Sequence, residues 1–289
     1  MKTILRQIKI LFAVMALIFI GYFAWDSRDQ ASAIVAQADV MLLVMSVMIW
    51  IILHSVAPLF PVSIFASFSS RLSFRDAFYI NASRLPAKYL PGGIWHSVAR
   101  VEGYHGSGVS PRNIALYFVI ENAGAAGVTL LVGAGILIMS NHLTTAFYNL
   151  FAVIIFVALI CLILMPVIIN RYLLKDVSLS GKHYINGLLV LFIYWIGASL
   201  SFFFYVSSMP KLEGMLGTIE IMGVYLFSWG VGFITLFAPQ GIGVSEYVAS
   251  LLIPGTLSPT AMIALLVGFR IIILIADLTT WTISLLLKN

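Results

Sequence analysis

The chain has 289 residues, of which 61% are hydrophobic and 9% are charged. A soluble domain carries about 25% charged residues, so this composition excludes a soluble protein and predicts an integral membrane protein. The net charge of +5 does not indicate a nucleic-acid partner, because nearly all basic residues fall in segments that would lie on the same side of a bilayer. We expect an all-α polytopic membrane protein with a single domain over residues 1–289.

Cys161 is the only cysteine, so the chain can form neither an internal disulfide nor a thiolate metal site. The five histidines show no ligand spacing such as HExxH. The sequence also lacks a Ser/His dyad, a paired-aspartate motif and a nucleotide-binding loop. We therefore expect no metal, no cofactor and no enzymatic activity, and a gradient or a partner would have to drive any transport.

Six apolar runs are long enough to cross about 30 Å of hydrocarbon. They are residues 4–25, 40–60, 111–139, 146–169, 184–207 and 259–287. The length of the first run, and the lack of a small-x-small cleavage site after it, favour a retained span over a signal peptide. Two segments remain ambiguous, a mixed one at 71–112 and an apolar one at 215–237 that breaks at APQGIGVSEYVAS.

The two halves of the chain match at a shift of 148 residues (239 − 91). The stretch PGGI at 91–94 recurs as PQGI at 239–242, and the pair SP at 110–111 recurs at 258–259. The same shift superposes the apolar runs in order, which predicts a duplication with halves 1–145 and 146–289. Paired segments interrupted by Gly and Pro at matching positions of two halves indicate a transporter binding site.

The basic residues indicate the topology. Suppose that the mixed segment and its counterpart at residues 215–250 each enter the membrane and return as a re-entrant hairpin. Each half then crosses three times, the second half is inverted, and nearly all Lys and Arg lie on one side. Only Arg28 and Lys211 lie on the other side, and Arg270 lies within the membrane. Since cytoplasmic loops carry excess Lys and Arg, we expect both termini in the cytoplasm, with the protein in the bacterial inner membrane. The alternative, a full crossing by residues 215–237, gives seven or eight full spans.

The first Pro/Gly motif has a physical explanation as the tip of a hairpin. Pro91 stops a helix, and Gly92 and Gly93 allow a tight reversal of the backbone. The helix that restarts after them presents unbonded N–H groups, which attract anions. A second tip with Gln240 and Gly241 would act in the same way from the opposite face. The alternative is that both motifs are surface turns between spans.

Charged residues also occur inside the predicted spans. Glu121 lies ten residues after Pro111 and Arg270 lies eleven residues after Pro259, so both reach about mid-bilayer in the inverted arrangement. Asn122 is the shifted equivalent of Arg270. Since an unpaired charge at this depth costs several kcal/mol, we expect Glu121 and Arg270 to pair or to face water. They would either fix the packing of the helices or line a path for a charged headgroup or a proton.

The segments RLPAKYLPGGIWHSVARVEG and APQGIGVSEYVAS resemble the two signature regions of the lysylphosphatidylglycerol synthase transmembrane-region family. That family includes the flippase half of bacterial multiple-peptide-resistance factors and many stand-alone membrane proteins. The matching residues are Pro91, Gly92, Gly93 and Arg100 in the first region and Pro239, Gly241, Gly243 and Glu246 in the second. The resemblance covers nearly the whole chain. It implies movement of lipid between leaflets rather than lipid synthesis, because the aminoacyl-transferring part of the family is a separate soluble domain.

Three functions remain open. We favour flippase-like translocation of an anionic phospholipid or a polyprenyl or glycolipid. In this hypothesis Arg100 contacts the headgroup, and Glu246 balances Arg100 when the site is empty or takes up a proton. The alternatives are a proton-coupled secondary transporter of a small solute and a non-transporting membrane partner of a glycosyltransferase or lipid-modifying enzyme. The candidate substrate-binding residues are Arg84, Lys88, Gly92, Gly93, Arg100, Glu102, Glu121, Asn122, Gln240, Gly241, Glu246 and Arg270.

The re-entrant arrangement predicts that both tips are shielded from water on either side of the membrane. Cysteines placed at Gly92 and Gly241, in a Cys161→Ser background, should therefore react slowly with a membrane-impermeant thiol reagent in intact cells. Rapid labelling of both positions, as in a surface loop, would rule out the hairpins.

Overall fold

The computed structural model describes residues 38–89, 95–139, 145–174, 178–210, 218–235, 243–252 and 259–287. These residues form helices and no strand, which confirms the predicted all-α membrane protein. The first predicted span, residues 4–25, lies outside the described residues, as do Pro91, Gly92 and Gly93 of the first tip and Pro239, Gln240 and Gly241 of the second.

Within the described part of the chain, five segments are long and apolar enough to cross a membrane. They are α3 (Val40–Val56) with α4 (Leu59–Ser67), α7 (Pro111–Met139), α8 (Thr145–Ile168) with the π-helical turn η2 (Ile169–Leu173), α9 (Gly181–Ser207) and α12 (Pro259–Leu286). Large apolar side chains such as Val153, Phe156 and Ile163 of α8 are exposed on the outside of the bundle. An apolar surface of this kind suits lipid rather than water.

Shorter helices lie in the described parts of the mixed segment and of its counterpart before α12. They are α5 (Phe74–Ala82), the 3-10 helix η1 (Leu85–Tyr89) and α6 (Trp95–Gly106) before α7, and α10 (Thr218–Ile234) and α11 (Val244–Leu252) before α12. The 17 residues of α10 extend over about 25 Å, which is shorter than about 30 Å of hydrocarbon. Under the 148-residue shift, α6 and α7 fall on α11 and α12.

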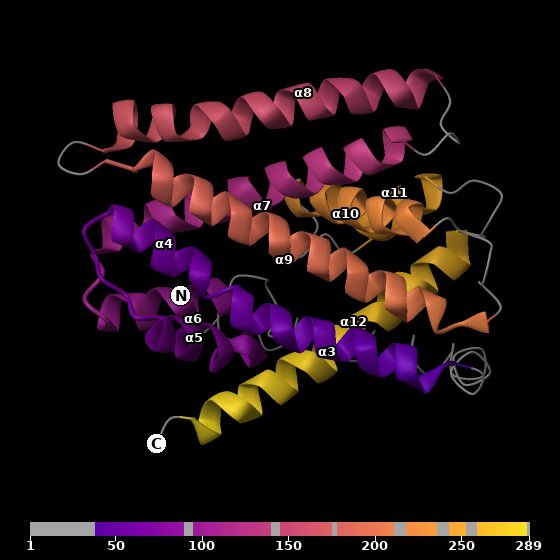
Figure 1. The fold of residues 1–289 in the computed structure, drawn as a ribbon, viewed down its shortest axis with the longest axis horizontal. Coiled ribbons are helices and arrows are strands. Elements are labelled where there is room, and N and C mark those ends of the chain that lie inside the picture. The colour runs from indigo at the N-terminus through magenta and orange to yellow at the C-terminus, as the bar shows by residue number, and fades with distance from the viewer. Residues whose placement is uncertain are drawn as a thin grey trace, which may run out of the picture.

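The segment α3–α4 runs antiparallel to α9 (Figure 1). At one end, the amide of Asp39 before α3 donates to the carbonyl of Ser208 after α9 (2.7 Å). Toward the other end, the hydroxyl of Ser63 on α4 donates to the carbonyl of His183 on α9 (2.9 Å). Since α9 is the shifted equivalent of α3, inverted halves would require these opposite directions. The complete inverted repeat stays a prediction, because its first span lies outside the described residues.

The chain leaves one end of the bundle after α4 and returns to the same end before α7. Asn113, at the start of α7, donates to the hydroxyl of Ser70, just after α4 (3.4 Å). Arg112 donates to the carbonyl of Leu173, at the end of η2 (2.5 Å). Residues 71–110 therefore make no net crossing. The described basic residues at this end are Arg71, Arg75, Arg112, Arg171 and Lys182.

Small residues let α7 and α10 approach closely in the middle of the bundle. A Cβ added to Gly133 on α7 would lie 2.5 Å from the backbone nitrogen of Phe227 on α10. A Cβ added to Gly230 on α10 would lie 2.7 Å from the hydroxyl of Thr129 on α7. Membrane helices pack through such contacts because lipid provides little hydrophobic drive for helix association.

The close approach predicts different effects for two glycines of the same helix. Gly133→Ala should destabilise the protein by about 1–3 kcal/mol, because the added methyl must displace the α10 backbone. Gly135→Ala is the matched control, since no described atom lies within 4 Å of its added Cβ. Thermal unfolding of both variants in one detergent measures the difference, and equal unfolding midpoints would contradict the close packing.

Candidate functional site

A buried ion pair joins α6 to α7. Arg100 on α6 donates from Nη1 to Oε1 of Glu121 (2.8 Å) and from Nη2 to Oε2 (2.5 Å). Only 9% of the Arg100 side chain and 20% of the Glu121 side chain are exposed. Two parallel charge-assisted hydrogen bonds fix the geometry of the pair, and its burial limits screening by salt.

Neighbouring side chains hold this ion pair in place. Tyr117 donates to Oε1 of Glu121 (2.6 Å) and accepts from Nη1 of Arg100 (3.3 Å). Asn81 on α5 accepts from the same Nη1 (3.2 Å). The Phe118 ring centre lies 4.8 Å from the guanidinium carbon, within the range of a cation–π contact. Contacts from two other helices therefore hold the guanidinium of Arg100.

A second ion pair joins α11 to α12 with the charges exchanged. Glu246 on α11 accepts from Nη2 of Arg270 on α12 (2.7 Å). Its other oxygen accepts from the amide of Gly243 (2.7 Å) and the hydroxyl of Ser245 (2.8 Å). Gly243 directly precedes α11, so the carboxylate caps the start of its own helix. Gly243 has a φ of 87°, in the region that favours glycine.

The two ion pairs occupy corresponding places in the two halves. Each ties the helix that follows a Pro/Gly tip to the span that comes next. A shift of 148 residues carries Arg100 to within two residues of Glu246 and carries Glu121 to the position before Arg270. The pairs differ in exposure, since 35% of the Arg270 side chain is exposed, against 4% for Glu246. Of the four charged groups, Arg270 is thus the most accessible.

The predicted pair between Glu121 and Arg270 is wrong, because each binds the charge on the neighbouring short helix of its own half. The expectation that Glu246 balances Arg100 is wrong for the same reason. The spacing within each span predicted a mid-bilayer depth for each charge, and that depth stays a prediction. The spacing did not reveal which short helix would present a partner to each charge.

A third polar cluster surrounds Asp277, which lies two turns after Arg270 on α12 and is 1% exposed. Its Oδ1 lies 2.7 Å from Nε2 of His54 on α3. Its Oδ2 accepts from Nζ of Lys88 and from the hydroxyl of Tyr89, each at 2.8 Å. Partial burial and the Asp277 carboxylate raise the pKa of Tyr89 above its usual value, so the phenol keeps its proton.

Asp277, His54 and Tyr89 were not among the site residues predicted from the sequence. One signal was available, because a spacing of seven residues puts Arg270 and Asp277 on one face of a helix. A buried acid in a span is also a candidate functional residue by default. His54 offered no such signal, since its partner is 223 residues away in the chain.

The other predicted site residues do not join these clusters. Nε of Arg84 donates to the carbonyl of Ala99 (2.8 Å) and so attaches the segment before η1 to α6. Glu102 and Asn122 are exposed. Gly92, Gly93, Gln240 and Gly241 lie outside the described residues. No group of three His, Cys, Asp or Glu side chains in the described ranges could hold a metal ion.

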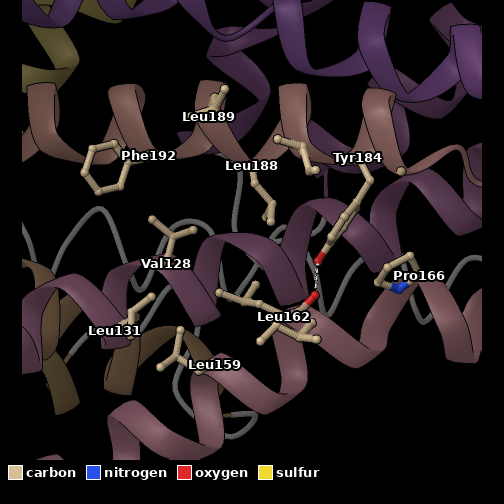
Figure 2. A pocket seen from close by; sticks show the side chains of 12 residues that line it. Val128, Leu131, Leu159, Leu162, Pro166, Tyr184, Leu188, Leu189 and Phe192 are labelled. Carbon is tan, nitrogen blue, oxygen red and sulfur yellow. Dashed lines mark hydrogen bonds between the residues drawn. The ribbon is translucent and has the colours of Figure 1, made fainter.

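A groove of about 500 Å³ lies between α7, α8 and α9 (Figure 2). The described residues that line it include none of the charged clusters. Side chains such as Val128, Leu159 and Phe192 form an apolar wall. The hydroxyl of Tyr184 donates to the carbonyl of Leu162 (2.6 Å), so these two polar atoms satisfy each other. Such a wall offers little to a polar solute but suits a hydrocarbon chain.

No protein-family model matches the chain, and no curated protein matches it. The resemblance to the lysylphosphatidylglycerol synthase transmembrane-region family and the functions that it implies therefore stay predictions.

The observed pairing predicts which charges are energetically coupled. Removing Arg100 or Glu121 alone should cost about 3–5 kcal/mol, because the remaining buried charge loses its partner. The double variant should be milder than the sum of the singles, with a coupling of about 0.5–3 kcal/mol in equilibrium unfolding. The control is the crossed double variant of Glu121 and Arg270, whose effects should add. Additive effects within the Arg100–Glu121 pair would contradict the structure.

Proposed function

We propose that this protein moves an anionic lipid between the two leaflets of a membrane. The observation that carries the proposal is the pair of matching ion pairs, one in each half, inside an apolar bundle. Each lies on the helix that follows a Pro/Gly tip and on the next span. Two similar polar sites approached from opposite faces would suit a headgroup that passes from one leaflet to the other.

Arg270 is the cation best placed to receive the headgroup. Its hydrogen bond to Glu246 uses Nη2, and about a third of its side chain is exposed. A guanidinium has five donors in a fixed plane, so it can hold a carboxylate and a phosphate together. Arg100 is enclosed and bound through both arms by Glu121, so a headgroup would have to displace Glu121 to reach it. We therefore assign first contact to Arg270 instead of Arg100.

The apolar groove and the basic end of the bundle are in keeping with this function. The groove would hold an acyl chain of the lipid while its headgroup lies at the polar site. The bundle end that carries Arg71, Arg112 and Lys182 would face the cytoplasm, by the rule that cytoplasmic loops are rich in Lys and Arg. Both termini would then be cytoplasmic, and the membrane would be a bacterial inner membrane.

A proton-coupled transporter of a small solute is the second candidate. The three acids Glu121, Glu246 and Asp277 lie inside the bundle and favour it, because intramembrane acids often carry protons. The apolar wall of the groove gives a polar solute few partners, which is why we place lipid first.

A lipid-movement assay tests the proposal. Vesicles of phosphatidylglycerol and phosphatidylethanolamine would contain the full chain and a trace of fluorescent phosphatidylglycerol, and a reductant would quench the outer leaflet. The wild-type protein should speed exchange between leaflets. Arg270→Ala should slow this exchange by at least about tenfold, since a hydrogen bond to a charged group contributes about 1.5–3 kcal/mol. Arg270→Lys should also slow it, because Lys lacks the planar fork.

Lys182→Ala is the control, since it removes an exposed positive charge at the end of the bundle. It should leave the rate of exchange unchanged. Exchange no faster than in protein-free vesicles would reject lipid movement and favour a non-transporting partner of a lipid-modifying enzyme or glycosyltransferase. If Arg270→Ala exchanged lipid between leaflets at the wild-type rate, the proposed contact between Arg270 and the headgroup would be wrong.

A further inference from the structure

We propose that Asp277 and His54 form a proton-binding site, and that a proton bound there weakens the hold of Asp277 on Lys88. This inference rests on the proposed function, because it supplies the coupling between a proton gradient and movement of the headgroup. Its evidence is independent of the two ion pairs, since it comes from the cluster that joins α12, α3 and η1.

With His54 in its neutral form, the cluster carries no net charge. One carboxylate receives the ammonium of Lys88, the phenol of Tyr89 and the imidazole of His54. Because the carboxylate can only accept, Nε2 of a neutral His54 must carry the hydrogen, which leaves Nδ1 to take a further proton. That proton, on His54 or shared with Asp277, gives the cluster one net positive charge. In a poorly solvated interior the added charge opposes the ammonium of Lys88.

The elements packed around α12 provide little to offset this added charge. Within the described ranges, the titratable groups near Asp277, besides His54 from α3 and the two η1 residues, are His96 of α6 and Tyr194 of α9. Neither carries a negative charge near neutral pH. The acids on the neighbouring helices, Glu121 and Glu246, each bind an arginine. From α5, Arg75 reaches only the far end of α12, near Leu287.

The position of Lys88 turns protonation into an effect on η1. Lys88 and Tyr89 end η1, so Asp277 fastens this short helix to a span of the other half. If Asp277 bound Lys88 less tightly, the ammonium of Lys88 would be able to pair with the anionic phosphate of a lipid headgroup. A proton and a headgroup would then bind together, each raising the affinity for the other by the same factor.

The test follows the mobility of η1 directly rather than transport. A nitroxide label on Ala87→Cys, in a Cys161→Ser background, would be observed by electron paramagnetic resonance from about pH 8 to about pH 5. The vesicles would again contain phosphatidylglycerol and phosphatidylethanolamine. The label should become more mobile as the pH falls. In Asp277→Asn the label should be mobile at every pH, because the neutral amide no longer holds Lys88.

His54→Gln keeps a donor toward Asp277 but cannot bind a proton, so the transition should move to lower pH by about one unit or more. If Asp277→Asn does not fold, the His54→Gln variant by itself tests the proton-binding site. A label on the native Cys161, which is exposed on α8, is the control and should show no transition.

The outcomes separate this inference from the proposed function. A pH transition at Ala87 that depends on His54, in a protein that moves no lipid, would support the proton site and reject lipid movement. Lipid movement in a protein whose Ala87 label does not respond to pH would overturn the proton site. An unchanged transition in His54→Gln would overturn it as well.

Discussion

A charge inside a poorly solvated bundle needs a partner, and this constraint shapes the centre of the molecule. Three carboxylates, Glu121, Glu246 and Asp277, each bind a cationic side chain. In every case the interaction ties a short helix near a Pro/Gly tip to a long span. Since losing either partner leaves a buried charge uncompensated, these contacts hold α6, α11 and η1 against the long spans. The apolar helices surround the ion pairs, and the ion pairs fix where each short helix lies along its neighbouring span.

The two halves use this constraint differently. In the first half, Arg100 is enclosed by Glu121, Tyr117 and Asn81, so its charge is largely shielded. In the second half, Glu246 is the enclosed partner, and Arg270 is reachable. The exchange of the two charges keeps the short helix bound to the span. It also makes a cation, Arg270, the most exposed charged group of the two pairs. This difference is why the proposed headgroup contact lies at Arg270.

The sequence was sufficient for the long helices but not for the pairing of charges. Hydropathy and length predicted all five spans of the described ranges, because a run of about 20 apolar residues has few other stable conformations in a bilayer. The second span was predicted to end at residue 60, yet the apolar segment continues to Ser67 across the break at Pro58. Spacing placed Glu121 and Arg270 within their spans, but their partners depend on how α6 and α11 pack against those spans. The contact of His54 with Asp277 depends on the packing of α3 against α12, which no local pattern encodes.

The identity of the lipid that stays bound decides whether this protein recognises an anionic headgroup. Native mass spectrometry of the full chain, released from membranes under mild conditions, would show which lipids stay bound. The account predicts retained anionic phospholipid in preference to phosphatidylethanolamine, and loss of that preference in Arg270→Ala. Equal retention of anionic and zwitterionic lipids by the wild-type protein would contradict it.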